Sequence, residues 1–121
     1  MKVIIAGGRE FSDYSLLSSV CDHMLQNYAP RDIEIVSGTA NGADKLGERY
    51  AKENNCKIKQ FPADWSLGKQ AGYIRNKQMA EYADCLIAFW DGKSKGTKHM
   101  IDLAEKQGLK VKIVRYDSIR T

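Results

Sequence analysis

Short apolar runs recur five times along the chain, and a segment with helical periodicity separates each run from the next. The runs span residues 3–6, 33–36, 56–61, 85–89 and 111–114. Strands that alternate with helices pair in parallel through right-handed crossovers, and the helices cover both faces of the sheet. Three of the runs lack a strict apolar–polar alternation, as expected of strands buried on both faces. The pattern therefore predicts an α/β fold, a single three-layer Rossmann-like domain with a five-stranded parallel sheet.

Four helices are expected between these strands. The first has apolar residues spaced by three and four over 14–28, with Ser12 or Asp13 as its N-cap and Pro30 ending it. The others are expected from residue 43 to 54 or 55, from residue 68 or 72 to 82, and from an N-cap at Thr97 to a C′ glycine at Gly108.

The length of 121 residues fits one domain, residues 1–121, with a hydrophobic core and no room for a second domain. No apolar run approaches the roughly 20 residues that span a bilayer, and the apolar start of the chain is too short for a signal peptide. We therefore expect a cytoplasmic protein with no membrane partner.

Three cysteines lie far apart, each inside an apolar pattern, which favours buried free thiols. His23 and His99 form no metal-ligand spacing with them, so the sequence indicates neither a metal nor a cofactor. The net charge of +4 mildly favours anionic ligands but is too small to indicate nucleic acid by itself.

Ligands of open parallel sheets bind beyond the carboxyl ends of the strands, where helix N-termini present unpaired amides. The loop after the first strand, "AGGRE", has two glycines that allow a close backbone approach and an arginine that can meet a phosphate or carboxylate. The loop after the second strand, "SGTANGAD", is built of small residues and leads to an acid that could contact a ribose or cap the helix. The candidate binding residues of these two loops are Gly7, Gly8, Arg9, Ser37, Gly38, Thr39, Gly42 and Asp44.

The loops after the third and fourth strands offer aromatic, acidic and basic side chains. "FPADWSLGKQAGYIRN" contains a tryptophan that can stack on a base or cover the sheet edge, and an arginine that can reach the same ligand or remain solvated. In "FWDGKSKGT", glycines and a hydroxyl precede a helix, an arrangement that favours anion binding over a solvated lysine loop. The candidates here are Asp64, Trp65, Arg75, Asn76, Trp90, Asp91, Gly92, Gly96 and Thr97. Neither a P-loop motif nor a G-x-G-x-x-G fingerprint is present.

Taken in this order, "AGGREFSDY", "VSGTANGAD", "FPADWSLGKQAGYIRNKQM" and "ADCLIAFWDGKSKGT" resemble the YspA-like, cpYpsA-related branch of the SLOG superfamily. The resemblance extends from Val3 to Val114 and implies a Rossmann-like fold that binds a nucleotide or a nucleotide-derived ligand. The superfamily includes the LOG phosphoribohydrolases and the DNA-processing protein A family, and its members often pair through helices beside the site, which implies a homodimer.

Comparison with the LOG enzymes bears on catalysis. As in those enzymes, an arginine (Arg75) precedes a methionine (Met79) by four residues, followed by a strand and a glycine-rich loop ending in Gly96 and Thr97. Three residues past the threonine, however, the LOG glutamate is replaced by Met100, which cannot exchange a proton. The resemblance therefore implies ligand binding more strongly than hydrolysis.

Two alternatives remain open at this stage. A nucleotide hydrolase would use Arg75 to position the phosphate and Asp44, Asp64 or Asp91 as acid or base, and nothing in the sequence selects among the three. Single-stranded DNA binding is disfavoured because the aromatic residues are not interleaved with a basic stripe.

Overall fold

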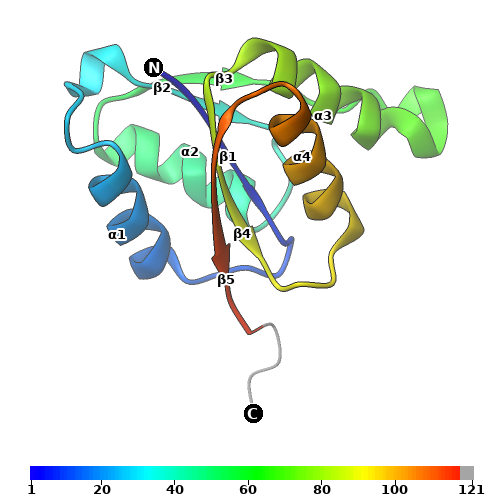
Figure 1. The fold of residues 1–121 in the computed structure, drawn as a ribbon, viewed down its shortest axis with the longest axis horizontal. Coiled ribbons are helices and arrows are strands. Elements are labelled where there is room, and N and C mark those ends of the chain that lie inside the picture. The colour runs from blue at the N-terminus through cyan, green and yellow to red at the C-terminus, as the bar shows by residue number, and fades with distance from the viewer. Residues whose placement is uncertain (118–121) are drawn as a thin grey trace.

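The computed structural model describes residues 1–117 and shows one five-stranded sheet between two layers of helices (Figure 1). The strands are β1 (Lys2–Gly7), β2 (Glu34–Ser37), β3 (Lys57–Gln60), β4 (Cys85–Trp90) and β5 (Lys110–Arg115). The helices are α1 (Tyr14–Met24), α2 (Ala43–Glu53), α3 (Ala71–Tyr82) and α4 (Lys95–Lys106), with 3-10 helices η1 (Pro30–Asp32) and η2 (Trp65–Gln70). The predicted Rossmann-like α/β fold is confirmed.

All strand pairs are parallel, and their order is β3-β2-β1-β4-β5. From β1 the sheet extends to one side through β2 and β3 and to the other side through β4 and β5. The order of the strands therefore reverses between β1 and β4. These two central strands pair from Val3 with Cys85 to Gly7 with Phe89, so their carboxyl ends lie side by side. This reversal is where open α/β sheets place their ligand crevice.

Two hydrophobic cores hold the layers together. On one face, α1 and α2 pack on Val3, Ile5 and Ile87; on the other, α3 and α4 pack on Ile4 and Leu86. Neighbouring residues of one strand thus belong to opposite cores, which is why the central strands read as continuous apolar runs. The edge strands β3 and β5 bury little and carry exposed lysines.

The helix boundaries correct two expectations, the end of α1 and the N-cap of α4, and decide between the two starts expected for α3. Asp13 is the N-cap of α1, where its side chain accepts a hydrogen bond from the Leu16 amide, but the helix ends at Met24 and Pro30 begins η1 instead of terminating α1. A kink at Gly68, with φ of 77°, separates η2 from α3, so the helix proper starts at Ala71.

The N-cap of α4 is Ser94 and not Thr97, which lies buried in the first turn. The other end of α4 agrees with the sequence: Gly108 follows the C-cap with φ of 78°.

Candidate functional site

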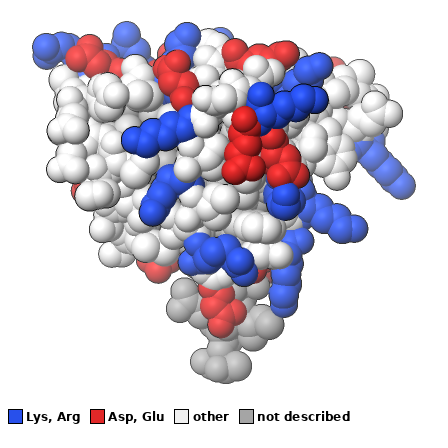
Figure 2. All heavy atoms as spheres, viewed as in Figure 1, with Lys and Arg blue, Asp and Glu red and all other residues white. Residues whose placement is uncertain are grey.

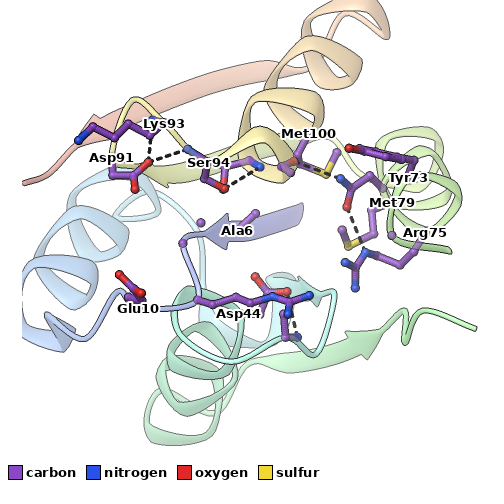
Figure 3. Close-up of a pocket in the computed structure, with 18 of the residues that line it drawn as sticks. Ala6, Glu10, Asp44, Tyr73, Arg75, Met79, Asp91, Lys93, Ser94 and Met100 are labelled. Atoms are coloured by element: carbon purple, nitrogen blue, oxygen red, sulfur yellow. Dashed lines mark hydrogen bonds between the residues drawn. The ribbon is translucent and has the colours of Figure 1, made fainter. Parts of the chain in front are cut away.

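A cleft of about 560 Å³ opens at the carboxyl ends of β1 and β4. Its walls come from the β1–α1 loop, the start of α3, and the β4–α4 loop with the first turn of α4 (Figure 3). In the close-up, Asp44 and Glu10 lie on one wall, Asp91 and Ser94 on the facing wall, and Arg75 at one side. The cleft therefore lies where the topology places ligands in this class of sheet.

Arg75 connects three segments around this cleft. Its Nη1 donates to the carbonyl oxygen of Gly38, and its Nε donates to Oδ1 of Asn76 at 3.0 Å. The Asn76 amide in turn donates to the carbonyl oxygen of Gly96 at 3.3 Å. Burial lowers the pKa of Arg75, and so does the nearby charge of Arg9, whereas Asp44 raises it. A guanidinium remains charged under these conditions, so the cleft holds a fixed cation.

Asp44 is buried, with 6% of the residue exposed, although it belongs to the first turn of α2. Its Oδ2 accepts a hydrogen bond from the Ala40 amide at 3.2 Å. Burial raises the pKa of Asp44 to about 6, against the opposing effects of that hydrogen bond and of the charges of Arg75 and Arg9. A carboxyl group with such a pKa can exchange a proton near neutral pH.

The pKa of Asp91 is shifted in the opposite direction from that of Asp44. Its Oδ1 accepts hydrogen bonds from the amides of Lys93 and Ser94, both at 2.8 Å. These two bonds lower the pKa of Asp91, with the Ser94 bond contributing most. The two amide bonds thus favour the ionised form of Asp91, and through them its side chain fixes the β4–α4 loop.

The first turn of α4 carries unpaired backbone donors, and its Gly96 lines the cleft. Oγ of Ser94 accepts from the Thr97 amide at 3.4 Å and lies 3.1 Å from the Thr97 hydroxyl. Among residues 1–117, the amides of Lys95 and Gly96 have no hydrogen-bond partner. A Cβ added to Gly96 would meet no atom within 4 Å, so this surface is open. Unpaired amides at a helix N-terminus favour an anion.

A buried network of hydrogen bonds between β2, α2 and β3 holds the β2–α2 loop in place. The Ser37 hydroxyl donates to Glu48 at 2.6 Å and accepts from the Thr39 amide at 3.0 Å, and the Gln60 amide donates to Glu48 at 3.2 Å. These bonds hold Thr39 in a left-handed conformation, with φ of 66°. Ser37 is fully buried in this network, so its role here is to position the loop.

Most of the predicted site residues come together. A smaller hollow of about 280 Å³ adjoins the cleft and shares Arg9, Ala40, Trp65 and Arg75 with it. The cleft is lined by ten of the predicted residues, and the smaller hollow adds two more: Gly7, Gly8, Arg9, Asp44, Trp65, Arg75, Asn76, Asp91, Gly96 and Thr97, then Gly38 and Thr39.

Five predicted residues line neither space, Ser37 among them. Gly42 lies where the loops after β1 and β2 meet, because a Cβ there would fall 2.2 Å from the Gly8 carbonyl oxygen. Asp64 caps η2 by accepting from the Ser66 amide at 3.1 Å. The Trp90 indole donates to the Ser94 carbonyl oxygen at 3.1 Å, and Gly92 lies against the guanidinium of Arg115.

Several lining residues were not predicted from the sequence. They are Ala6, Glu10, Ala40, Lys69, Gly72, Tyr73, Met79, Lys93, Ser94, Met100 and Tyr116 in the cleft, and Asn41 and Ala63 in the smaller hollow. Tyr116 follows β5, whose carboxyl end lies at the same sheet edge as those of β1 and β4. The predicted topology could therefore have indicated that this residue lies near the cleft. Its hydroxyl lies over Gly8 and its ring packs edge-on against Phe11.

Within residues 1–117, no cluster of three or more His, Cys, Asp or Glu side chains could hold a metal ion. In the same part of the chain, none of the helices has the length and apolar character needed to cross a membrane.

The strand order and the position of the cleft define a Rossmann-like domain with a cleft at the topological switch point, where domains of this class bind their ligands. The chain belongs to the YspA, cpYpsA-related SLOG family, whose family model matches residues 1–68. It is 33% identical over 118 residues to Gene 61 protein of Mycobacterium phage D29, covering 91% of this chain and 93% of the phage protein. The fold is similar to that of DNA processing protein A from Helicobacter pylori, with a TM-score of 0.70 and 20% identity over 98% of this chain and 69% of that one.

Proposed function

We propose that the protein binds a nucleotide or a nucleotide-derived ligand in the cleft, with a phosphate group at the first turn of α4. The observation that carries this proposal is the presence in one cleft of a fixed guanidinium, Arg75, and of Gly96, whose backbone amide has no hydrogen-bond partner within residues 1–117. Such donors bind phosphate through charge-assisted hydrogen bonds. Membership of the SLOG family supports a nucleotide-related ligand.

The remaining groups of the cleft suggest how the ligand is oriented. Arg9 and Arg75 would neutralise its charge, and the hydroxyls of Ser94 and Thr97 would complete the phosphate contacts. Trp65 is 61% exposed and lines both spaces, so its ring can stack on a base. Trp90 is engaged with Ser94, and the Arg115 guanidinium lies 5.3 Å from its ring centroid, so we assign it no ligand contact.

Calorimetric titration with AMP tests the proposal. Arg75→Lys keeps the charge but loses the planar fork, so we expect it to weaken AMP binding about tenfold or more. The matched control is Arg49→Lys, since Arg49 forms a surface ion pair with Glu53 on α2 away from the cleft. Absence of AMP binding at millimolar concentration, or an equal effect of the two variants, would contradict the proposal.

A second candidate function is hydrolysis of the nucleotide's N-glycosidic bond. It is favoured by Asp44, whose raised pKa allows it to protonate the leaving base while water adds at C1′ of the ribose. Met100, which lines the same cleft, has no carboxylate. Chromatography of AMP after long incubation would show free adenine and ribose 5-phosphate, and Asp44→Asn would abolish both. If AMP is unchanged after incubation, hydrolysis is excluded for AMP and only the binding function remains.

Single-stranded DNA remains the disfavoured ligand. DNA processing protein A from Helicobacter pylori, of similar fold, binds single-stranded DNA. In the present chain, Lys and Arg side chains gather near the β4–α4 loop, but acidic side chains interrupt the face over α4 (Figure 2). We therefore expect no retardation of a labelled oligonucleotide at physiological salt.

The homodimer stays a prediction as well. Large apolar side chains are exposed on η2 and the start of α3, beside the cleft, namely Trp65, Leu67, Tyr73 and Ile74. A second copy that packs on this surface would bury them. Analytical ultracentrifugation of wild type and Leu67→Glu tests this arrangement, and a monomer in both would exclude it.

A further inference from the structure

The smaller hollow beside the cleft is a preformed space with its own polar lining. It is bounded by the end of β2, the β2–α2 loop and η2, and its lining includes Gly38, Thr39, Asn41 and Ala63. The loop is held by the Ser37–Thr39 and Asp44–Ala40 hydrogen bonds described above. Small side chains leave the space open, so it exists without rearrangement of the chain.

The charge at this hollow is one-sided. Arg9 and Arg75 line both spaces, and within residues 1–117 no acidic residue is part of the lining of the smaller one. The carboxyl group of Asp44 lies next to it, because its Oδ2 accepts from the Ala40 amide; the charge of Asp44 raises the pKa of Arg75, and the charge of Arg9 lowers it. Two guanidinium groups beside one carboxyl group leave an excess of positive charge, which favours an anion between Arg9 and Arg75.

Gly38 is the residue that allows this arrangement. A Cβ at Gly38 would lie 2.7 Å from Nη1 of Arg75 and 2.8 Å from Oδ2 of Asp44. The guanidinium is therefore packed against the backbone at the boundary between the two spaces, where it can contact groups in both.

We propose that the smaller hollow is a second anion subsite, and that the ligand is a small molecule with two phosphate groups at separate positions. One phosphate lies on the first turn of α4 in the cleft, as in the proposed function on which this inference rests, and the other lies between Arg9 and Arg75 in the smaller hollow. At the side of the cleft away from Arg75, the acidic residues Glu10 and Asp91 lie with one lysine, Lys93, so this side offers no excess of positive charge to a further phosphate (Figure 3). This favours a short ligand over a nucleic acid strand.

Titrations of the full chain with AMP, ADP and adenosine 3′,5′-bisphosphate test the subsite. ADP has two adjacent phosphates and is the control for the number of phosphate groups. We expect the bisphosphate to bind about tenfold or more tightly than either, because only it fills both subsites. Equal affinity of the bisphosphate and ADP would overturn the subsite and leave the proposed function standing, whereas failure of all three to bind would overturn both.

Two substitutions locate the extra affinity. Ala63→Met places a larger side chain in the hollow, and Asn41→Ala removes an exposed side-chain amide from its lining. Two variants are used so that the test still stands if one of them fails to fold. Each is expected to reduce binding of the bisphosphate and to leave AMP binding unchanged. If either substitution weakens AMP binding as much as bisphosphate binding, the proposal is overturned. It is also overturned if an oligothymidylate of eight nucleotides binds more tightly than the bisphosphate and Ala63→Met weakens that binding.

Discussion

The guanidinium of Arg75 donates a hydrogen bond to the carbonyl oxygen of Gly38, thirty-seven residues away in the chain. This contact fastens the start of α3 to the end of β2 and fixes a cation beside the cleft. It depends on the absence of a side chain at Gly38, because both Arg75 and Asp44 occupy the space that a Cβ would need.

Gly38→Ala is therefore expected to displace Arg75 and to weaken AMP binding about tenfold or more, the effect of losing one charge-assisted contact. Calorimetric titration measures this change. The control is Gly108→Ala, since a Cβ at Gly108 meets no atom within 4 Å and the residue lies beyond the far end of α4. If both variants bind as wild type does, the position of Arg75 does not determine affinity.

Much of the fold and of the site could be predicted from the sequence, because a parallel sheet brings the loops after its strands to one edge. Gly8, Arg9, Asp44 and Arg75 meet there for that reason. The failures depend on contacts between distant segments: whether Gly92 is open or covered depends on Arg115 from β5.

The prediction of Thr97 as the N-cap of α4 was wrong for a local reason. Ser94 and Thr97 lie three residues apart and both carry a hydroxyl group that can cap a helix, so residue type alone does not decide between them. In the structure the first of them caps, and Asp91 fixes the loop before it through two backbone amides.

Asp44 is expected to make stability depend on pH. Its pKa is raised from 3.8 to about 6 in the folded state, so the folded protein binds a proton that the unfolded chain has released between these pH values. The stabilising contribution is fully present below pH 4 and is lost as pH rises through 6, after which it stays constant. An asparagine side chain does not titrate, so Asp44→Asn does not lose this stability. The free energy of unfolding of the variant minus that of wild type should therefore rise by up to about 3 kcal/mol between pH 4 and pH 7.

Urea unfolding of wild type and Asp44→Asn at several pH values checks this expectation. Asp102→Asn is the control, because Asp102 is an exposed carboxylate in an ion pair with Lys98 on α4. A constant difference between wild type and Asp44→Asn across the range would show that Asp44 is not buried as described.

Glu48 is expected to matter for stability although it lies outside both ligand spaces. It is 6% exposed and accepts hydrogen bonds from Ser37 and Gln60. Glu48→Ala leaves the buried Ser37 hydroxyl without its closest partner and should lower the free energy of unfolding by roughly 2 kcal/mol. Glu48→Gln retains an acceptor and should lose less; equal losses in urea unfolding would count against the hydrogen-bond explanation.

Gly42 and Gly108 differ in the space that a side chain would find. Both have positive φ, 80° and 78°, so alanine is strained at either position, and the ψ of Gly42, −128°, lies outside the left-handed helical region, which adds to the strain there. At Gly108 a Cβ meets no atom within 4 Å, whereas at Gly42 it falls 2.2 Å from the Gly8 carbonyl oxygen. Gly42→Ala must therefore also separate the loops after β1 and β2, which overpacking data place at roughly 1–3 kcal/mol.

We expect Gly42→Ala to unfold at a clearly lower urea concentration than Gly108→Ala and to bind AMP more weakly, because the loop that carries Arg9 must move. Gly108→Ala should retain wild-type affinity, since it lies at the far end of α4. Equal unfolding midpoints for the two variants would mean that the loops accommodate a methyl group at Gly42 without cost, and that their close contact does not hold the cleft in shape.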